Sequence, residues 1–207
     1  MIRIITIERE YGSGGGEIAQ RLATLLSWKL WDQLLTEEIA RLAQCPKVVV
    51  ETREERTDPL YYRLFKSFLR GSYEGSLNAH KLNVVDSESI AKITERVVEK
   101  VAQEGNSVIV GRGSQHFLRN REDTLRVFLY APKEAKVRRL LTRGKTKSEA
   151  EQLVDFVDQE RADFIQKYFN VEWPNRAIYH TMINTAIGDQ AVVQNIQDLA
   201  KTLNSAK

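Results

Sequence analysis

A glycine-rich stretch near the start of the chain is the first place where chemistry can be expected. Residues 12–16 read GSGGG, after an apolar run at 2–7 and before a helical pattern. A glycine turn between a strand and a helix exposes backbone N–H groups where the helix dipole also favours an anion. The stretch therefore predicts a phosphate-binding loop. A tight turn with positive φ angles that binds nothing is the alternative.

The spacing of the glycines leaves the type of phosphate loop open. A Walker loop follows the pattern GxxxxGK[ST]. With Gly14 as its second glycine, the lysine position falls on Gly15 and the hydroxyl position on Gly16. Residues 14–19 satisfy the dinucleotide pattern GxGxxG/A instead, and Asp32 could then hold a ribose. The loop by itself does not decide between the two.

Charged residues beside the loop could take part in phosphate chemistry. Arg9 is our candidate for the cation that replaces the missing lysine. The alternative is an ordinary ion pair of Arg9 with Glu8, Glu10 or Asp32. Glu17 either complements the helix dipole or holds Mg²⁺ through water. The three histidines are scattered, so no metal-ligating cluster is predicted.

Apolar runs that alternate with helical patterns supply the frame for these residues. Strands are predicted at 2–7, 29–31, 107–110, 125–130 and 181–184, and helices at 17–27, 34–42, 87–103, 133–142, 148–168 and 190–203. This alternation indicates parallel βαβ units, with helices on both faces of one sheet. Because ligands bind beyond the carboxyl ends of parallel strands, we expect 8–16, Asp32 and 111–114 to meet in one crevice.

Composition narrows the class of protein. A chain of 207 residues predicts one domain, 1–207, and a net charge of +3 without a basic block argues against nucleic acid as the main partner. Cys45 is the single cysteine, which excludes an internal disulfide and suits a reducing compartment. Neither a signal peptide nor a membrane-spanning run is recognisable, so we expect a cytoplasmic protein.

Four segments in order give the chain a family resemblance. ITIEREYGSGGGEIAQRLA, WDQLLTEEIA, VIVGRGS and YHTMINTA resemble the cytidylate kinase-like family of P-loop proteins. These are relatives of nucleoside monophosphate (NMP) kinases that carry REYGSGG in place of a standard Walker sequence. The resemblance implies an α/β P-loop NTPase fold with a mostly parallel central sheet and helices on both faces. It also implies an NMP-binding helical region at 33–86 and a lid at 143–150.

The resemblance implies roles for residues of the loop and of the lid. The donor phosphates would be held by the N–H groups of Gly12, Ser13, Gly14, Gly15 and Gly16. Arg138 and Arg139 match a double arginine that leads to the lid, and Arg143 lies in the lid itself. Adjacent helical residues point about 100° apart, so at least one of these arginines is expected on a solvated face.

On the acceptor side, the resemblance points to four further residues. Arg112 matches the arginine of a GRD segment that contacts acceptor phosphate, with Gly113 in place of the aspartate. Asp158 and Arg161 match an acidic and basic pair that helps to recognise the nucleotide, and Asp32 is a further substrate-binding candidate. Surface ion pairing of Arg112, and a local salt bridge between Asp158 and Arg161, are the alternatives.

The function implied is that of a kinase that transfers phosphate from ATP, with Mg²⁺, to a small acceptor. A nucleoside monophosphate is the default acceptor, and Arg9, Arg112 and Arg139 are the catalytic candidates. One alternative is a catalytically degenerate, nucleotide-binding regulatory protein, which the missing lysine motivates. The other is a Rossmann dinucleotide enzyme. In each case the expected partners are small-molecule nucleotides rather than nucleic acid or membrane.

Overall fold

A parallel sheet of five strands forms the centre of the protein in a computed structural model, which describes residues 1–42 and 87–205. The strands are β1 (Ile4–Arg9), β2 (Lys29–Trp31), β3 (Ser107–Val110), β4 (Thr124–Tyr130) and β5 (Thr181–Asn184). Their order is β2-β3-β1-β4-β5, so β1 lies between β3 and β4 and pairs in parallel with both. All six residues of β1 are buried, as expected for the central strand of a sheet covered on both faces.

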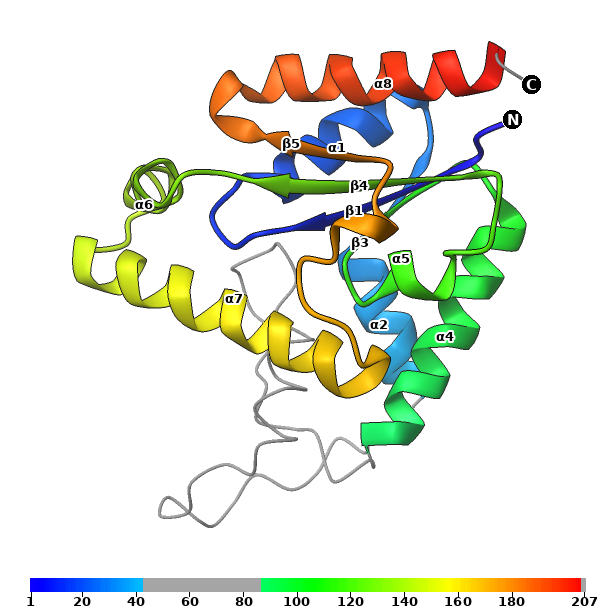
Figure 1. Ribbon diagram of the computed structural model, residues 1–207, viewed down its shortest axis with the longest axis horizontal. Helices are drawn as coiled ribbons and strands as arrows, with labels where there is room; N and C mark the ends of the chain where they lie inside the picture. The colour runs from blue at the N-terminus through cyan, green and yellow to red at the C-terminus, as the bar shows by residue number, and fades with distance from the viewer. Residues whose placement is uncertain (43–86, 206–207) are drawn as a thin grey trace.

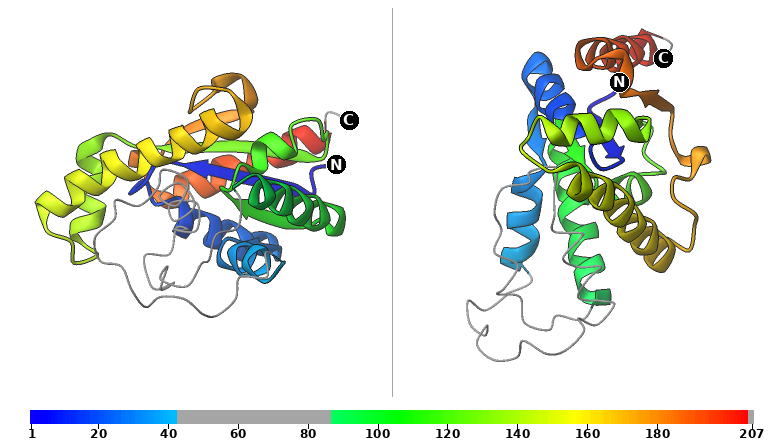
Figure 2. Two further views of the ribbon diagram at one scale, coloured as in Figure 1. Left: turned by 90° about the horizontal axis from the view of Figure 1, so that it is seen from below. Right: turned by 90° about the vertical axis from the view of Figure 1, so that its left-hand side faces the viewer.

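Helices cover both faces of the sheet (Figures 1 and 2). One face carries α1 (Gly15–Leu26) and α8 (Asp189–Ser205), and the other carries α2 (Gln33–Leu42), α4 (Ser87–Glu104) and α5 (Ser114–Phe117). Successive residues of a strand point to opposite faces. Ile5 of β1 therefore packs against the α1 and α8 side, whereas Ile4 packs against the α2 and α4 side.

Two further helices form a hairpin beyond the carboxyl end of β4. They are α6 (Lys133–Leu141) and α7 (Lys147–Phe169), and they pack through Val137, Leu140, Ala150 and Val154. Thr146 begins α7 with a capping box, in which its hydroxyl accepts the Glu149 N–H while the Glu149 side chain accepts the Thr146 N–H. The segment 143–150, predicted as a lid, corresponds to the α6–α7 turn and the first residues of α7.

The predicted strands and helices are confirmed, with ends that shift by up to two residues. The exceptions are short: α5 and the 3₁₀ turns Arg176–Ile178 and Thr185–Ile187 were not predicted, because three or four residues show no helical period. The predicted helical region 33–86 is described only as far as Leu42, and its remainder lies outside the described residues.

The strand order also decides against the Rossmann alternative. In a Rossmann sheet the second strand lies directly beside the first. Here β3 lies between β1 and β2, which pairs with β3 alone. Asp32, which follows β2, is therefore two strands away from the glycine loop and pairs with Arg112. The dinucleotide interpretation of the glycine loop was wrong.

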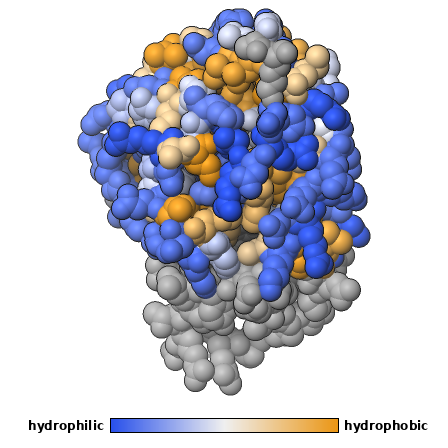
Figure 3. Space-filling model, turned by 45° about the vertical axis from the view of Figure 1, so that its right-hand side comes forward, coloured by the Kyte–Doolittle hydropathy of each residue, from blue (hydrophilic) through white to orange (hydrophobic). Residues whose placement is uncertain are grey.

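Hydrophilic residues cover most of the face drawn in Figure 3. Large apolar side chains are exposed at separate places in the described chain, among them Leu25 on α1, Phe156 on α7 and Ile187 before α8. None of the described helices combines the length and the apolar character of a transmembrane span.

Candidate functional site

The glycine loop joins the end of β1 to the start of α1. Gly12 and Gly14 have φ angles of 77° and 84°, a conformation that glycine adopts without strain. Gly14 is the N-cap of α1 and provides no side-chain hydrogen bond to the helix. The first-turn N–H groups of α1 are thus left without a capping side chain, which is the arrangement that binds phosphate at helix N-termini.

Close packing is a second reason for the glycines, because three basic side chains lie against the loop. A Cβ at Gly12 would lie 3.1 Å from the Cβ of Lys136, and one at Gly15 would lie 2.8 Å from the Cβ and Cγ of Arg9. At Gly14 a Cβ would overlap the guanidinium of Arg139. A side chain at Gly12, Gly14 or Gly15 would therefore crowd Lys136, Arg139 or Arg9, respectively.

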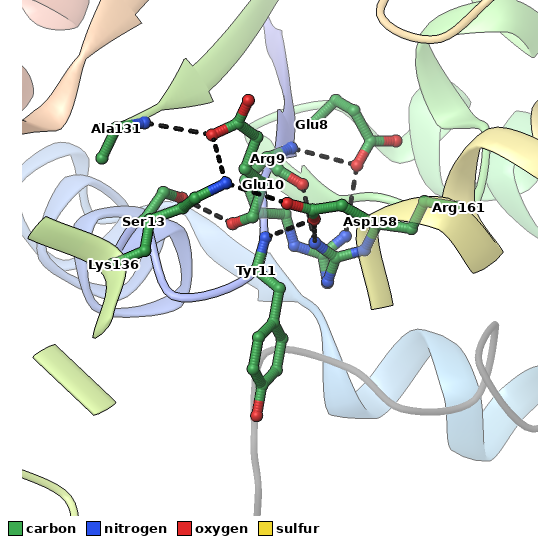
Figure 4. Close-up of polar contacts among 9 residues, drawn as sticks. All are labelled: Glu8, Arg9, Glu10, Tyr11, Ser13, Ala131, Lys136, Asp158 and Arg161. Carbon is green, nitrogen blue, oxygen red and sulfur yellow. Dashed lines mark hydrogen bonds and ion pairs between the residues drawn. The ribbon is translucent and has the colours of Figure 1, made fainter. Parts of the chain in front are cut away.

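A network of polar contacts holds the loop in place (Figure 4). Asp158 of α7 accepts the N–H of Tyr11 at 2.7 Å, and Lys136 of α6 bonds both Asp158 (3.1 Å) and Glu10 (2.9 Å). The second contact of Glu10 is the N–H of Ala131, at 3.2 Å. Thus Asp158, predicted to bind substrate, contacts the phosphate loop itself.

Arg9 is the last residue of β1, and Arg161 of α7 contacts it there. Arg161 donates to the carbonyl oxygen of Arg9 at 2.8 Å and lies 3.4 Å from Asp158. The guanidinium of Arg9 lies 3.4 Å from Glu8, whose other carboxylate oxygen accepts from Gln115 at 3.1 Å. Arg9 thus makes one of the local ion pairs considered above, with Glu8, and this contact leaves a role in phosphate binding open.

The turn after β3 is strained in the way that functional turns often are. Gly111, Arg112 and Gly113 have successive φ angles of 66°, 58° and 68°, and this conformation is unfavourable for arginine. Arg112 is buried, donates to the hydroxyl of Thr36 and lies 3.5 Å from Asp32. The strained backbone therefore directs a buried guanidinium toward the junction of β2 and α2.

Electrostatics around the strand ends favour an anion. Burial lowers the pKa of Arg112 and of Arg161 to about 10, and the positive charge of Arg9 contributes in both cases. Both guanidinium groups remain charged at neutral pH, with Asp32 and Asp158 opposing the shift. Cations that repel one another in a buried site gain from a bound anion.

Burial and ion pairs also act on Asp158 and Lys136 at the loop, with a different outcome for each. Burial raises the pKa of Asp158, although Arg161 and Lys136 oppose the change. Burial also acts to lower the pKa of Lys136, but Asp158 and Glu10 outweigh it, so that this pKa is raised. Lys136 is therefore charged at neutral pH, and it ties the loop through its contacts with Asp158 and Glu10.

A pocket opens over the loop at the carboxyl end of β1. Its walls are residues 10–12 and 14–17 together with Arg9, Arg143 and Arg161. Arg143, in the α6–α7 turn, forms an ion pair with Glu17 at the rim of this pocket. Among the described residues, no group of three or more His, Cys, Asp or Glu side chains could hold a metal ion.

The predicted lid arginines separate into different positions. Arg139 covers Gly14 and pairs with Asp189, the first residue of α8, at 2.7 and 3.2 Å. Arg138 is exposed on α6, as expected for one of two adjacent residues on a helix. Lys136, which the sequence reasoning missed, precedes Arg139 by three residues and Arg143 by seven. That helical spacing was the available signal.

Comparisons with known proteins identify the family. A family model described as the cytidylate kinase-like family matches residues 4–187. An uncharacterized protein from Eubacterium ventriosum has a similar structure, with a TM-score of 0.64, 21% identity and coverage of 96% of this chain and 99% of that one.

Two shikimate kinase structures are also similar, but at lower identity. The structure from Acinetobacter baumannii, in complex with shikimate, has a TM-score of 0.54 and 16% identity, covering 98% of this chain and 94% of that one. The structure from Bacteroides thetaiotaomicron has a TM-score of 0.53 and 16% identity, covering 97% and 99%. At these identities the likeness concerns the fold, and no curated protein sequence matches the chain. With its loop, strand order and family match in agreement, the chain belongs to the cytidylate kinase-like family of P-loop proteins.

Proposed function

We propose that the protein is an ATP-dependent phosphotransferase that acts on a small acceptor, with a nucleoside monophosphate as the default. The observation that carries this proposal is the pocket over the glycine loop, whose walls combine the uncapped start of α1 with Arg9, Arg143 and Arg161. Phosphoryl transfer needs positioning and positive charge more than covalent chemistry from the protein. Both are available at this pocket.

We assign the donor triphosphate to the loop. Backbone N–H groups at the start of α1 and the dipole of a 12-residue helix favour its phosphates. Arginine forks bind phosphate oxygens in pairs and keep their charge. Arg139, which lies over Gly14, and Arg143, at the rim, are the groups that we assign to the nucleotide from the α6–α7 side.

Mg²⁺ has no preformed ligand set among the described residues. Gly16 stands where a Walker loop has its Ser or Thr hydroxyl, Lys136 and the Ala131 N–H engage Glu10, and Arg143 engages Glu17. Mg²⁺ commonly binds through substrate phosphates and water with few protein ligands. We therefore expect Mg²⁺ to bind through the phosphates of the nucleotide and through water.

The acceptor belongs beside Arg112. This guanidinium follows the end of β3 and is buried next to Thr36 and Asp32. A phosphate-bearing acceptor would gain a paired contact with its fork. Residues 43–86, which complete the predicted acceptor region, lie outside the described part of the chain.

A phosphotransfer panel tests the proposal. Purified protein is incubated with Mg-ATP and each nucleoside monophosphate, including CMP, dCMP and UMP, and the products are separated directly. We expect a diphosphate product that is lost in Arg112→Ala and partly retained in Arg112→Lys. Arg3→Ala is the matched control, because Arg3 lies at the opposite end of β1 and is exposed.

The same panel addresses the second candidate, a nucleotide-binding regulatory protein without turnover. The observation that favours it is the missing loop lysine. ATP binding measured by calorimetry, with no product from any acceptor, would support this candidate and contradict the kinase proposal. Product formation by the wild-type protein would eliminate it.

A further inference from the structure

The missing loop lysine raises the question of which group neutralises the transferred phosphate. Three cationic side chains line the pocket: Arg9, Arg143 and Arg161. Arg143 pairs with Glu17 at the rim, where both side chains are partly exposed. Arg161 supports the backbone, since it donates to the carbonyl of Arg9. Arg9 comes directly from the central strand and has a side chain that is only 5% exposed.

Two glycines make room for the side chain of Arg9. Its Cβ and Cγ occupy the space where a side chain of Gly15 would begin, at 2.8 Å from an ideal Cβ. Its guanidinium nitrogen Nη1 occupies the corresponding space at Gly111. Arg9 therefore extends from the donor loop to the turn that carries Arg112, and each end of this path depends on a residue without a side chain.

A buried carboxylate orients the guanidinium. Glu8 accepts the backbone N–H of Arg9 at 3.0 Å and lies 3.4 Å from its Nη1. Gln115 of α5 holds the other oxygen of Glu8. A group with this support is restricted before ligand binds, so little reorganisation is needed when charge develops on the phosphate.

We propose that Arg9 performs the task of the Walker lysine by binding the transferring phosphoryl group between donor and acceptor. The inference rests on the proposed function. An oxygen of the acceptor phosphate forms the bond to the γ-phosphorus of ATP. The bond from that phosphorus to the bridging oxygen breaks, and ADP leaves with the electron pair. Arg9 stabilises the charge on the equatorial oxygens and exchanges no proton.

The position of Arg9 at the end of β1 allows an arginine to take the place of the loop lysine. A lysine in the first turn of α1 would approach the phosphates from the helix, whereas Arg9 reaches them from the end of β1, between Gly15 and Gly111. Its planar fork can bind two phosphate oxygens at once. The pocket thereby keeps a cation at the phosphates although its loop contains no lysine.

Steady-state kinetics of Arg9→Met and Arg9→Lys test the inference, with Arg3→Met at the other end of β1 as the matched control. We expect kcat of Arg9→Met to fall by about 10²–10³-fold. The calorimetric Kd for ATP should change by less than about tenfold, because the loop N–H groups remain. Arg9→Lys should fall between wild type and Arg9→Met, and added guanidinium should restore part of the Arg9→Met activity.

The outcomes separate the inference from the proposed function. Wild-type turnover with an unchanged kcat in Arg9→Met would overturn the role of Arg9 alone. No turnover in the wild type with any acceptor would overturn both. If Arg9→Met does not fold, a crystal structure of the wild type with a non-hydrolysable ATP analogue decides the matter. A hydrogen bond from the Arg9 guanidinium to the γ-phosphate supports the role, and its absence contradicts it.

Discussion

An ion pair lies at the rim of the pocket over the glycine loop. Glu17 projects from the first turn of α1 and pairs with Arg143 from the α6–α7 turn. The two sequence hypotheses for Glu17 were a helix-dipole role and a water-mediated Mg²⁺ contact. The ion pair suggests a third role, in which the Glu17 carboxylate competes with a bound phosphate for Arg143.

Replacing Glu17 should strengthen anion binding. In Glu17→Gln the negative charge disappears from the rim and Arg143 becomes available to phosphate. The pair is partly exposed, so the gain is small, about 0.5–1 kcal/mol or roughly two- to fivefold in the Kd for tripolyphosphate. Calorimetry at low ionic strength measures this change, and added salt should diminish it.

Glu151→Gln provides the matched control for Glu17→Gln. Glu151 pairs with Lys147 on α7, is similarly exposed and is absent from the pocket walls, so its replacement removes the same charge elsewhere. An equal gain in both variants would show that only net charge is involved. Weaker binding in Glu17→Gln would contradict the role of Glu17 as a competitor for Arg143.

The residues of the site could be predicted only where the sequence carries a local pattern. The glycine loop and Arg9 were candidates from motif and spacing, and Arg112 was a candidate from the family resemblance. Thr36 could not be found in this way, because its partner Arg112 lies on another element. For Lys136 the helical spacing to Arg139 was a signal, but it did not point to the partner Asp158 on α7. Such contacts depend on how elements pack, which a single sequence does not encode locally.

Among the elements, α7 connects the parts of the site. It begins at the capped α6–α7 turn, contacts the loop through Asp158 and Arg161, and ends at Phe169, whose ring lies 2.7 Å from where Gly113 would carry a Cβ. A displacement of α7 would therefore reach the phosphate loop and the Arg112 turn together. The sequence predicted this helix to within one residue at each end and offered the salt bridge between Asp158 and Arg161 as an alternative, but it did not predict the contacts of α7 with the loop.

Two parallel ion pairs between α6 and α7 allow a direct test of the loop tether. Lys136 pairs with Asp158 and Glu10 at the loop, and Lys133 pairs with Asp155 one helical turn earlier. The side chain of Lys136 is 9% exposed, whereas those of Lys133 and Asp155 are 50% and 65% exposed. Both are lysine–aspartate pairs between α6 and α7, but Lys136 is buried and has Glu10 as a second partner.

Removal of the buried lysine should destabilise the protein more than removal of the exposed one. Lys136→Met leaves two carboxylates without their cation and should lower the free energy of unfolding by about 2–4 kcal/mol. Lys133→Met should cost about 0–1 kcal/mol. Urea denaturation measures both values. Equal losses of unfolding free energy in the two variants would mean that the buried contacts of Lys136 stabilise the fold no more than the exposed Lys133–Asp155 pair does.

For the molecule as a whole, strand order assembles the site. Since β1 lies between β3 and β4, its carboxyl end brings the glycine loop beside the Arg112 turn, and β2 adds Asp32 from the next position. Parallel strands and a shared ligand edge were predictable from alternation of strand and helix. The pairing of β2 with β3 rather than β1 was not, because buried apolar strands do not specify their neighbours.

Ligand binding should stabilise the entire fold. A bound phosphate would relieve the repulsion among Arg9, Arg112 and Arg161 in the folded state. It would therefore raise the free energy of unfolding. Tripolyphosphate at about 100 times its Kd should add about 2.7 kcal/mol and raise the Tm by roughly 5–10 °C. Differential scanning calorimetry measures the shift. Sodium chloride of equal ionic strength is the control, and an equal shift in both would indicate general screening.

Acid stability depends on a histidine at the centre of the packed α5–α7 contact. His116 is buried and stacks on Phe169, with ring centroids 4.3 Å apart. Burial lowers the pKa of His116 from 6.5 to about 4, helped by Arg119 and opposed by Glu8. Between these two values the unfolded chain binds a proton that the folded chain does not. Stability should therefore fall as the pH decreases from 6.5 toward 4.

His116→Phe isolates this contribution. Phenylalanine keeps an aromatic ring against Phe169 but cannot bind a proton, so the variant should lose less stability in acid than the wild type. One pKa unit corresponds to about 1.4 kcal/mol, so the difference between about pH 7 and about pH 5 should amount to about 1–2 kcal/mol. Urea denaturation of both proteins at the two pH values measures it, since carboxylate titration is common to both. Parallel pH profiles would show that the pKa of His116 is the same in the folded and the unfolded chain, and would contradict its contribution to acid stability.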